Sequence, residues 1–310
     1  MTKALCDVVI IGSGPAAYTA GIYTARAALS TVMYAGDVPG GQLLLTSEVE
    51  NWPGFRDGIM GPELMEEMKA QTERFGVKIH HEFVAKVVPG KGQHSVELAS
   101  GEVISARTII VATGAQAQWL GLENETRLMA KGISACATCD GYFFQDKHVV
   151  VVGGGDTAME EALTLTKFAD KVTVVHRRDS LRASKIMQER ARKHPKISFI
   201  WDSAVTDVLG ENMVSGVEIT NLKTQAQQTL DCGGLFVAIG HLPATDFLKG
   251  VIDLDEKGYI AVKDNVFTSV DGIFAAGDVA DKRYRQAITA AGDGCRAALE
   301  VEHYLANLDG

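Results

Sequence analysis

The feature that most constrains the fold is a strand, a glycine-rich turn and a helix in that order, a pattern that occurs twice. Val8–Ile11 is a continuous apolar run, typical of a strand buried on both faces, and the turn Gly12–Ala17 and an expected helix at Tyr18–Ala28 follow it. His148–Val152 leads in the same way into Gly153–Ala158. Such a turn is typical of folds that hold a dinucleotide pyrophosphate at the start of a helix. Two copies in one chain predict two Rossmann-like dinucleotide-binding domains of the α/β class.

The two copies differ after their second strands, where the ribose of a dinucleotide is usually read. In the first copy, Ala35 stands where an acidic residue often binds the ribose hydroxyls. In the second copy, His176 is followed by Arg177, Arg178 and Arg182. Three arginines suit a 2′-phosphate, because it offers several acceptors and two negative charges. We therefore expect NADPH rather than NADH in the second copy, with a solvated basic turn as the alternative.

Two cysteines, Cys136 and Cys139, are separated by two residues and followed directly by Asp140. In a chain without secretory features, this spacing indicates redox or metal chemistry rather than a structural disulfide. A zinc site would need two further ligands, and no second CxxC or spaced histidine pair accompanies this one. Two unreactive buried cysteines remain an alternative. The pattern favours a redox dithiol and no metal site.

Composition and charge exclude several other classes of protein. The 310 residues suffice for two domains, and 46% hydrophobic with 22% charged residues is ordinary for a globular protein. A net charge of -9 without a long basic run argues against nucleic acid as the main ligand. No apolar segment reaches membrane-spanning length, and the first residues lead into a strand without a signal peptide. We therefore expect a cytoplasmic protein that does not bind a membrane.

Further strands end in residues suited to ligand contact. Ile109–Gly114 and Leu235–Gly240 are similar apolar strands that end in small-residue turns. Gly272–Val279 carries Asp278 at its carboxyl end, where ligands bind in parallel α/β sheets. Arg285–Ala287 then opens a long helix, whose N-terminus favours negative charge such as that of a reduced flavin. The alternative role for Asp278 is a simple cap.

Other segments are expected to complete the sheets and their surface. Gly61–Phe75 has helical apolar spacing, with a proline in its first turn. His94–Ala106 alternates apolar and polar residues around a glycine turn, which predicts a hairpin. The histidines His80, His81 and His94 are expected on the surface.

Eight stretches together identify a family. They are GSGPAA at 12–17, GGQLLLTSEVENWPGF at 40–55, VATGA at 111–115, CATCDG at 136–141, VVGGGDTAMEEAL at 151–163, HRRDSLR at 176–182, GLFVAIGH at 234–241 and GIFAAGDVADKRYRQAITAAGDGC at 272–295. The sequence resembles the low-molecular-weight, bacterial-type thioredoxin reductases of the FAD/NADPH pyridine nucleotide-disulfide oxidoreductase family. The resemblance covers essentially the whole chain. CATCDG before GGGDTA, with HRRxxxR downstream, is its most specific part.

The resemblance implies two α/β domains, each with a parallel sheet between layers and a small antiparallel meander. It places an FAD-binding domain in residues 1–116 and 247–310. An NADPH-binding domain, residues 117–246, is inserted between these segments and carries the dithiol. Short crossings near 115–118 and 242–247 would act as hinges for a rotation of the inserted domain. The resemblance also implies a homodimer with one FAD per chain.

The resemblance assigns residues to each nucleotide. Those implied for FAD are Gly12, Ser13, Gly14, Pro15, Ala16, Ala35, Gly36, Gly40, Gly41, Gln42, Leu43, Thr46, Asn51, Val84, Ala112, Thr113, Gly114, Gly277, Asp278, Arg285, Gln286 and Ala287. Those implied for NADPH are Gly153, Gly154, Gly155, Asp156, Thr157, His176, Arg177, Arg178, Arg182, Ile239 and Gly240.

The implied activity is that of a thioredoxin-disulfide reductase. Electrons pass from NADPH through FAD to the Cys136–Cys139 disulfide and then to the disulfide of thioredoxin. By resemblance, Cys139 faces the flavin and Cys136 is the interchange thiol. Asp140 is placed to act as general acid and base, or alternatively caps the turn after the cysteines.

Two other functions stay open at this point. The same flavin and dithiol chemistry could serve a glutaredoxin-like protein or a peroxide-detoxification partner, because a docking surface is not a motif. Lys131, Tyr142 and Phe143 flank the dithiol and are our candidates for partner contact. A non-catalytic redox sensor that responds to NADPH is the second alternative, and the intact CATCD argues against it.

Overall fold

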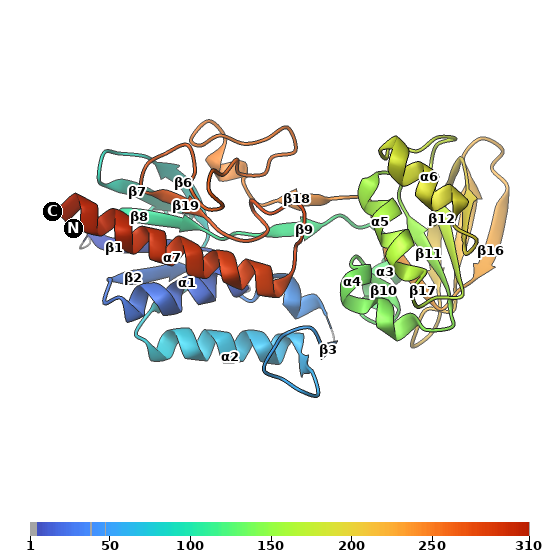
Figure 1. The fold of residues 1–310 in the computed structure, drawn as a ribbon, viewed down its shortest axis with the longest axis horizontal. Helices are drawn as coiled ribbons and strands as arrows, with labels where there is room; N and C mark the ends of the chain where they lie inside the picture. The colour runs from blue at the N-terminus through green and yellow to red at the C-terminus, as the bar shows by residue number, and fades with distance from the viewer. Residues whose placement is uncertain (1–4, 38, 47, 310) are drawn as a thin grey trace. The chain divides into compact units, whose positions relative to one another are not determined.

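The computed structural model describes residues 5–37, 39–46 and 48–309, and within them the chain forms two compact units. Unit 1 is built from the chain up to Gln116 and from Leu242 onward, and unit 2 is Ala117–His241. The chain passes between the units at β9 (Ala115–Ala117) and β18 (His241–Pro243), which pair as a small sheet (Figure 1). Residues 1–4 and Ser47, which belong to stretches used in the sequence analysis, lie outside the described ranges.

The main sheet of unit 1 has the strand order β5-β2-β1-β8-β7-β6, and β19 also pairs with β8. β8 has two kinds of neighbour: its first half pairs antiparallel with β7, and its second half pairs in parallel with β19. β1, β2 and β5 are parallel to it. The remaining elements of unit 1 are β1 (Cys6–Ile11), α1 (Pro15–Arg26), β2 (Thr31–Tyr34), η1 (Gly41–Leu45), β3 (Glu48–Val49), β4 (Ile59–Met60), α2 (Gly61–Arg74), β5 (Lys78–His80), β6 (Val84–Val88), β7 (His94–Leu98), β8 (Val103–Val111), η3 (Asp246–Leu248), β19 (Ile273–Ala275) and α7 (Ala287–Asp309).

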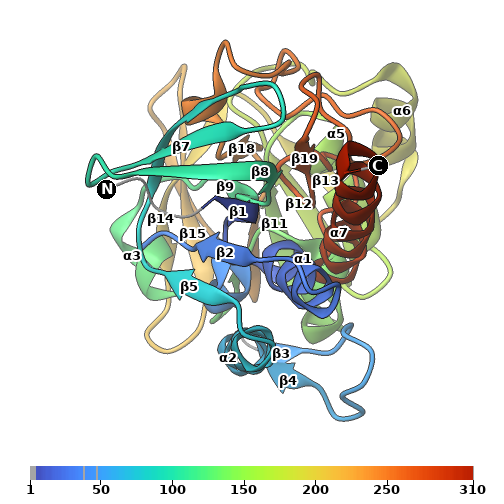
Figure 2. The ribbon, with the colours of Figure 1, turned by 90° about the vertical axis from the view of Figure 1, so that its left-hand side faces the viewer.

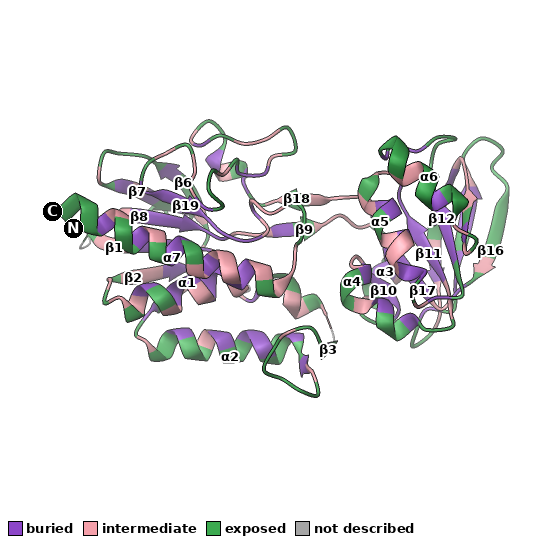
Figure 3. Ribbon diagram, viewed as in Figure 1, coloured by how far each residue is buried: buried purple, intermediate pink, exposed green. Residues whose placement is uncertain are grey.

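Successive residues of the central strand bury opposite faces of this sheet. Val8 and Ile10 of β1 pack with residues of α1, α2 and α7, which cover one face (Figure 2). Val9 and Ile11 pack on the other face with residues of β6 and β7 and with the segment before β19. Figure 3 shows β8 and β19 largely buried, whereas α1, α2 and α7 each expose a stripe to solvent. The continuous apolar run of β1 is thus buried on both faces, as predicted.

Unit 2 repeats this design with a parallel sheet of order β10-β17-β11-β12-β13. One face carries Val149 and Val151 and packs on α5 and α6. The other face carries Val150 and Val152 and packs on the antiparallel sheet β14-β15-β16. The elements are α3 (Glu123–Arg127), β10 (Ile133–Ser134), α4 (Ala137–Asp140), η2 (Gly141–Phe144), β11 (His148–Val152), α5 (Asp156–Leu165), β12 (Lys171–Val175), α6 (Lys185–Lys193), β13 (Ile197–Ile200), β14 (Ser203–Leu209), β15 (Gly216–Asn221), β16 (Gln227–Asp231) and β17 (Gly234–Val237).

The predicted α/β class with parallel sheets and antiparallel meanders is confirmed, and the elements differ from expectation in detail. The first helix starts at Pro15 rather than Tyr18, because proline suits the first helical position. The surface prediction for His94 is wrong: its side chain is fully buried. His94 shares the buried face of β7 with Val96 and Leu98, at every second residue.

The second passage between the units lies a few residues before the expected boundary at 246. Residues after His241 are already bonded to unit 1, since Ala244 N–H donates to Gly114 O at 3.1 Å and Thr113 Oγ1 donates to Ala244 O at 2.8 Å. Across the described ranges, no helix combines the length and hydropathy that a membrane span requires.

Candidate active site

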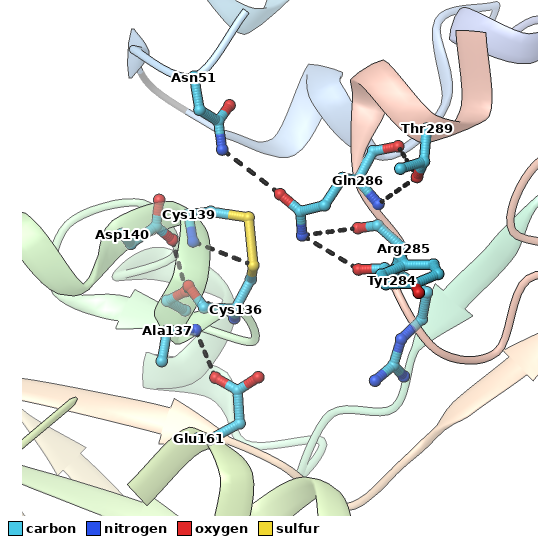
Figure 4. The surroundings of a disulfide bond; sticks show 11 residues. Asn51, Cys136, Ala137, Cys139, Asp140, Glu161, Tyr284, Arg285, Gln286 and Thr289 are labelled. Atoms are coloured by element: carbon cyan, nitrogen blue, oxygen red, sulfur yellow. Dashed lines mark hydrogen bonds between the residues drawn. A yellow bond between two sulfur atoms is a disulfide. The ribbon is translucent and has the colours of Figure 1, made fainter. Parts of the chain in front are cut away.

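Cys136 and Cys139 form a disulfide, with their Cα atoms 5.3 Å apart (Figure 4). Cys136 is the N-cap of the single-turn helix α4, and its Sγ accepts a hydrogen bond from Cys139 N–H at 3.2 Å. Cys139 is exposed and Cys136 is half-buried. The described residues contain no cluster of three or more His, Cys, Asp or Glu side chains that could hold a metal. The pair is therefore a closed disulfide in a tight turn, with Cys139 exposed to solvent.

Asp140 lies next to this disulfide and is held by a serine that the sequence analysis missed. The Ser134 hydroxyl donates to Asp140 Oδ2, and Ser134 Oγ accepts from Cys136 N–H at 3.0 Å. Burial raises the pKa of the Asp140 carboxyl, and the hydrogen bond from Ser134 acts in the opposite direction. Asp140 therefore keeps its proton to a higher pH than an exposed aspartate does, which suits a proton donor.

The second missed residue is Glu161, on α5. Its carboxylate accepts a hydrogen bond from Ala137 N–H, directly after Cys136 (Figure 4). Nothing in the sequence indicated this contact, because Glu161 lies 24 residues from Ala137 and belongs to an ordinary helical pattern.

The first glycine turn requires glycine for a steric reason. Gly12 has φ +125°, and a Cβ there would lie 2.1 Å from Ala112 O. Next to it, Ser13 Oγ donates to Ala35 O at 3.0 Å and accepts from Gly40 N–H at 3.2 Å. Ser13 thus joins the ends of β1 and β2 to the loop before η1, and brings three predicted FAD segments together.

Asp278 follows β19 and carries a buried acceptor that needs a partner. Among the described residues, its Oδ1 is buried without a hydrogen-bond partner. Burial, followed by the charge of Asp281, raises the pKa of Asp278 from 3.8 to about 7. A buried orphan acceptor has a large desolvation cost, so this site fits a ligand that brings a hydroxyl or N–H donor.

The start of α7 is held to the loop after β3. Asn51 Nδ2 donates to Gln286 Oε1 at 3.4 Å, and Gln286 Nε2 donates to Arg285 O at 3.1 Å (Figure 4). Three residues from two distant stretches of the predicted FAD set are therefore adjacent.

The second glycine turn repeats the steric requirement of the first. Gly153 has φ +154°, and a Cβ there would lie 2.4 Å from Ala238 O, in the loop after β17. Ala238 follows β17 as Ala112 follows β8, so the two copies match in structure as well as in sequence. At Gly154, a Cβ would meet the His176 ring at 2.2 Å, so this glycine lets the ring lie over the turn.

The basic loop after β12 is tied to this turn. Arg182 N–H and Ala183 N–H both donate to Gly154 O, at 2.7 and 3.1 Å. Ser184 donates to Asp156 Oδ1 through its N–H and its hydroxyl, at 2.8 Å each.

The arginines of this loop are available to a ligand. Arg177, Arg178 and Arg182 are exposed, and within the described part of the chain none of them forms an ion pair. Burial, followed by the charges of these arginines, lowers the pKa of His176, and the hydrogen bond to Ser180 O acts in the opposite direction. Exposed arginines without acidic partners fit a ligand with a dianionic phosphate.

Both glycine turns leave the start of the following helix without a side-chain cap. Gly14 and Gly155 are the N-caps of α1 and α5, and neither helix has a side-chain cap. Among the described residues, nothing lies within 4 Å of the point where a Cβ would stand at either glycine. The first turns of α1 and α5 therefore keep N–H groups without a side-chain cap, as dinucleotide binding requires.

The predicted site residues fall into two groups, one in each unit. The FAD set lies in unit 1 at Gly12–Ala16 after β1, Ala35 and Gly36 after β2, Gly40–Leu43 and Thr46 around η1, Asn51 after β3, Val84 at the start of β6, Ala112–Gly114 after β8, Gly277 and Asp278 after β19, and Arg285–Ala287 at the start of α7. The NADPH set lies in unit 2 at Gly153–Thr157 after β11, His176–Arg178 and Arg182 after β12, and Ile239 and Gly240 after β17. Val84 differs from the rest of its group in that it lies on an antiparallel strand.

Comparison with known proteins agrees with this geometry. The pyridine nucleotide-disulphide oxidoreductase family matches residues 6–294. A Streptomyces coelicolor protein named thioredoxin reductase is 54% identical over 304 residues, which cover 97% of this chain and 94% of the relative. A Mycobacterium leprae protein named bifunctional thioredoxin reductase/thioredoxin is 50% identical over 97% of this chain and 66% of its own length.

Solved structures of the same name have the same fold. The thioredoxin reductase of Streptococcus pyogenes MGAS5005 has a TM-score of 0.94 and 45% identity, with 99% of this chain and 100% of that chain covered. The family as a whole uses a flavin and a nicotinamide nucleotide. The chain is therefore an oxidoreductase that belongs to the thioredoxin reductases of the pyridine nucleotide-disulphide oxidoreductase family.

Proposed function

We propose that this protein uses NADPH and FAD to reduce the disulfide of a thioredoxin through Cys136 and Cys139. The observation that carries the proposal is the closed Cys136–Cys139 disulfide, which lies in the same unit as the arginine-flanked glycine turn. A disulfide in a tight, accessible turn beside a carboxyl has the parts that thiol–disulfide exchange needs.

FAD is assigned to unit 1. Its pyrophosphate would lie at the N-terminus of α1, beside Gly12 and Gly14. A flavin or ribitol donor would satisfy Asp278 Oδ1, the buried acceptor that has no partner among the described residues. When bound, FAD supplies the two-electron chemistry between the nicotinamide and the disulfide.

NADPH is assigned to unit 2. Its pyrophosphate would lie at the N-terminus of α5, and Arg177, Arg178 and Arg182 would hold the 2′-phosphate. Two backbone bonds to Gly154 O and the Asp156–Ser184 contacts fix the loop that presents these arginines. The three exposed arginines that this loop carries are why we assign NADPH rather than NADH.

The chain's own residues carry out the exchange. Reduction of Cys136–Cys139 takes two electrons and two protons and yields two thiols. The Cys136 thiolate then attacks one sulfur of the partner disulfide, forms a mixed disulfide and releases one partner thiolate. Cys139 attacks Cys136 Sγ, which restores the disulfide and releases the second thiolate. Asp140, with its raised pKa, donates a proton to a departing thiolate.

We propose that the protein works as a homodimer in the cytoplasm and that thioredoxin is the partner whose disulfide it reduces. Thioredoxin is supported by the Mycobacterium leprae relative, which is named for a reductase and a thioredoxin in one chain. Tyr142 and Phe143, next to the dithiol, are 57% and 37% exposed, so they offer an apolar contact to a docking protein. The dimer and the location rest on family resemblance alone.

The test is NADPH oxidation by the purified holoenzyme against a panel of disulfide proteins. We expect turnover with a thioredoxin and at least tenfold lower kcat/KM with a glutaredoxin or a peroxiredoxin-system protein. A higher kcat/KM with the glutaredoxin or with the peroxiredoxin-system protein would identify that protein as the partner instead. NADPH oxidation without thiol production in any partner would contradict the reductase function.

A further inference from the structure

Glu161 makes a contact with the redox turn that the proposed mechanism does not use. Its carboxylate, on α5, accepts the hydrogen bond of Ala137 N–H. Ala137 is 1% exposed and its nitrogen is bonded directly to the carbonyl carbon of Cys136. Figure 4 shows the Glu161 carboxylate pointing toward this nitrogen, next to the disulfide. A buried N–H would otherwise lack a partner, so the contact stabilises the turn.

Two other N–H groups of the turn, those of Cys139 and Asp140, are satisfied from within it. Cys139 N–H reaches Cys136 O at 3.2 Å and Cys136 Sγ at 3.2 Å, and Asp140 N–H reaches Cys136 O at 3.0 Å. The bond from Ala137 N–H to Glu161 is therefore the hydrogen bond that ties the first residue of α4 to a neighbouring helix. It fixes the backbone that carries Cys136 Sγ.

The contact also brings a carboxylate to the residue that follows Cys136, the interchange thiol of the proposed mechanism. A carboxylate that accepts a backbone N–H is stabilised in its charged form. Asp140, the other carboxyl of the turn, is shifted by burial toward its neutral form. Among the described residues, the elements that make the most contact with α4 are α5 and η2, and η2 contributes one titratable group, Tyr142.

The other charged residues of α5 have different surroundings. Asp156 is bonded to Ser184 at the far side of the basic loop, and Glu160 is exposed. Glu161 is therefore the carboxylate of α5 that is bonded to the redox turn.

We propose that Glu161 is a positioning residue for the redox dithiol: it fixes the Cys136 backbone, and its negative charge disfavours the Cys136 thiolate. The proposal deepens the proposed function and rests on Cys136 and Cys139 being its redox pair. A disfavoured thiolate makes the open dithiol less stable relative to the disulfide, so the pair gives up its electrons more readily. Glu161 therefore helps to set the direction of transfer toward the partner.

The charge is tested by alkylation of Cys136 in the holoenzyme. A Cys139→Ser background leaves Cys136 as the one thiol of the turn, and peptide mass spectrometry separates it from the other cysteines. Glu161→Gln keeps an acceptor for Ala137 N–H and removes the charge. We expect Cys136 to react with iodoacetamide about fivefold faster at neutral pH, with its profile moved to lower pH. Glu218→Gln, an exposed residue of β15, is the matched control and should change nothing. An unchanged or slower rate in Glu161→Gln would overturn the electrostatic role.

The effect on the redox couple is tested with both cysteines present. The holoenzyme is equilibrated with mixtures of reduced and oxidised dithiothreitol, in which one protein disulfide is reduced for each dithiothreitol oxidised. The thiols of Cys136 and Cys139 are then trapped by alkylation and counted. At about pH 8 we expect Glu161→Gln to shift this equilibrium about fivefold toward the Cys136–Cys139 dithiol. No shift would contradict the proposal.

The positioning role has a separate readout. Hydrogen exchange of the peptide that contains residues 134–141 should be faster in Glu161→Ala than in Glu161→Gln. Equal exchange rates of this peptide in the wild type and in both variants would contradict the positioning role. None of these measurements uses turnover, so a wild-type enzyme that fails to reduce thioredoxin would contradict the proposed function alone.

Discussion

At the scale of single residues, burial raises the pKa of two carboxyls that lie in different surroundings. Burial raises the pKa of both Asp140 and Asp278. Asp140 accepts a hydrogen bond from Ser134, whereas Asp278 Oδ1 has no partner among the described residues. The surroundings of Asp140 suit a group that takes up and releases a proton in each catalytic cycle. Those of Asp278 suit a group that accepts a hydrogen bond from a bound ligand.

We predict that Asp140→Asn keeps its FAD and loses most of its disulfide reductase rate. Loss of a general acid typically lowers a rate by about 10²–10⁴-fold. Thermal stability should be close to wild type, because the asparagine oxygen can still accept the hydrogen bond from Ser134, and burying a neutral amide avoids the cost of a buried charge. Stopped-flow flavin reoxidation by the enzyme's own disulfide is the measurement. A wild-type rate for that step would make Asp140 a structural residue.

For Asp278 we predict a pH-dependent stability of the FAD-free protein. Its raised pKa means that the folded carboxyl keeps its proton up to about pH 7, whereas the unfolded one loses it near 3.8. The native state then binds more protons in this range, so the free energy of unfolding falls as pH rises. Asp278→Asn should remove this loss, which amounts to roughly 4 kcal/mol above pH 7. The measurement is the melting temperature of the wild type and of Asp278→Asn at about pH 5 and about pH 8. A difference in melting temperature between the two proteins that is the same at both pH values would contradict the prediction.

We predict that Cys136→Ser and Cys139→Ser each abolish disulfide reduction and leave FAD bound. The pair belongs to unit 2, and the residues assigned to FAD belong to unit 1. The measurements are the flavin absorbance of the purified variants and their turnover with thioredoxin. Appreciable turnover in either variant would contradict the dithiol mechanism.

At the scale of elements, the local sequence pattern was sufficient to predict those helices and strands whose apolar residues or glycines recur at a regular spacing. The strand–turn–helix copies, the hairpin of β7 and β8 and the helix α2 follow from periodicity and from glycines that no other residue can replace, such as Gly12 and Gly153. Contacts between distant elements were not predictable. The burial of His94 depends on which face of β7 meets the core, and Glu161 reaches Ala137 through the packing of α5 on α4.

The basic loop between β12 and α6 gives a prediction at this scale. Arg177→Ala combined with Arg178→Ala should raise the KM for NADPH much more than that for NADH. Each lost charge-assisted hydrogen bond to phosphate costs roughly 1.5–3 kcal/mol, or about ten- to a hundredfold in KM. Arg190→Ala, an exposed arginine of α6, is the matched control. Equal effects on both nucleotides would show that the arginines form only a solvated turn.

At the scale of the whole molecule, the sequence predicted an inserted domain, and the structure contains two compact units joined at two passages. The exact second passage was not predictable, because it depends on strand pairing between segments far apart in the chain. β9 and β18 pair there, and the bonds of Ala244 to Gly114 and Thr113 hold the returning chain to unit 1. Which nucleotide each unit binds stays a prediction.

That prediction can be tested by removing unit 2. Because β9 and β18 are paired neighbours, the ends at Gln116 and Leu242 can be joined by a bridge of about two to four glycine and serine residues. We predict that the joined unit 1 still binds FAD, since every residue assigned to FAD remains, and that it oxidises no NADPH. The excised unit 2, Ala117–His241, should bind NADP⁺ and no flavin, and Arg177→Ala with Arg178→Ala should abolish that binding. Absorbance spectra and calorimetric titration provide the measurements. Flavin in unit 2, or NADPH oxidation by unit 1 alone, would contradict the assignment of one nucleotide to each unit.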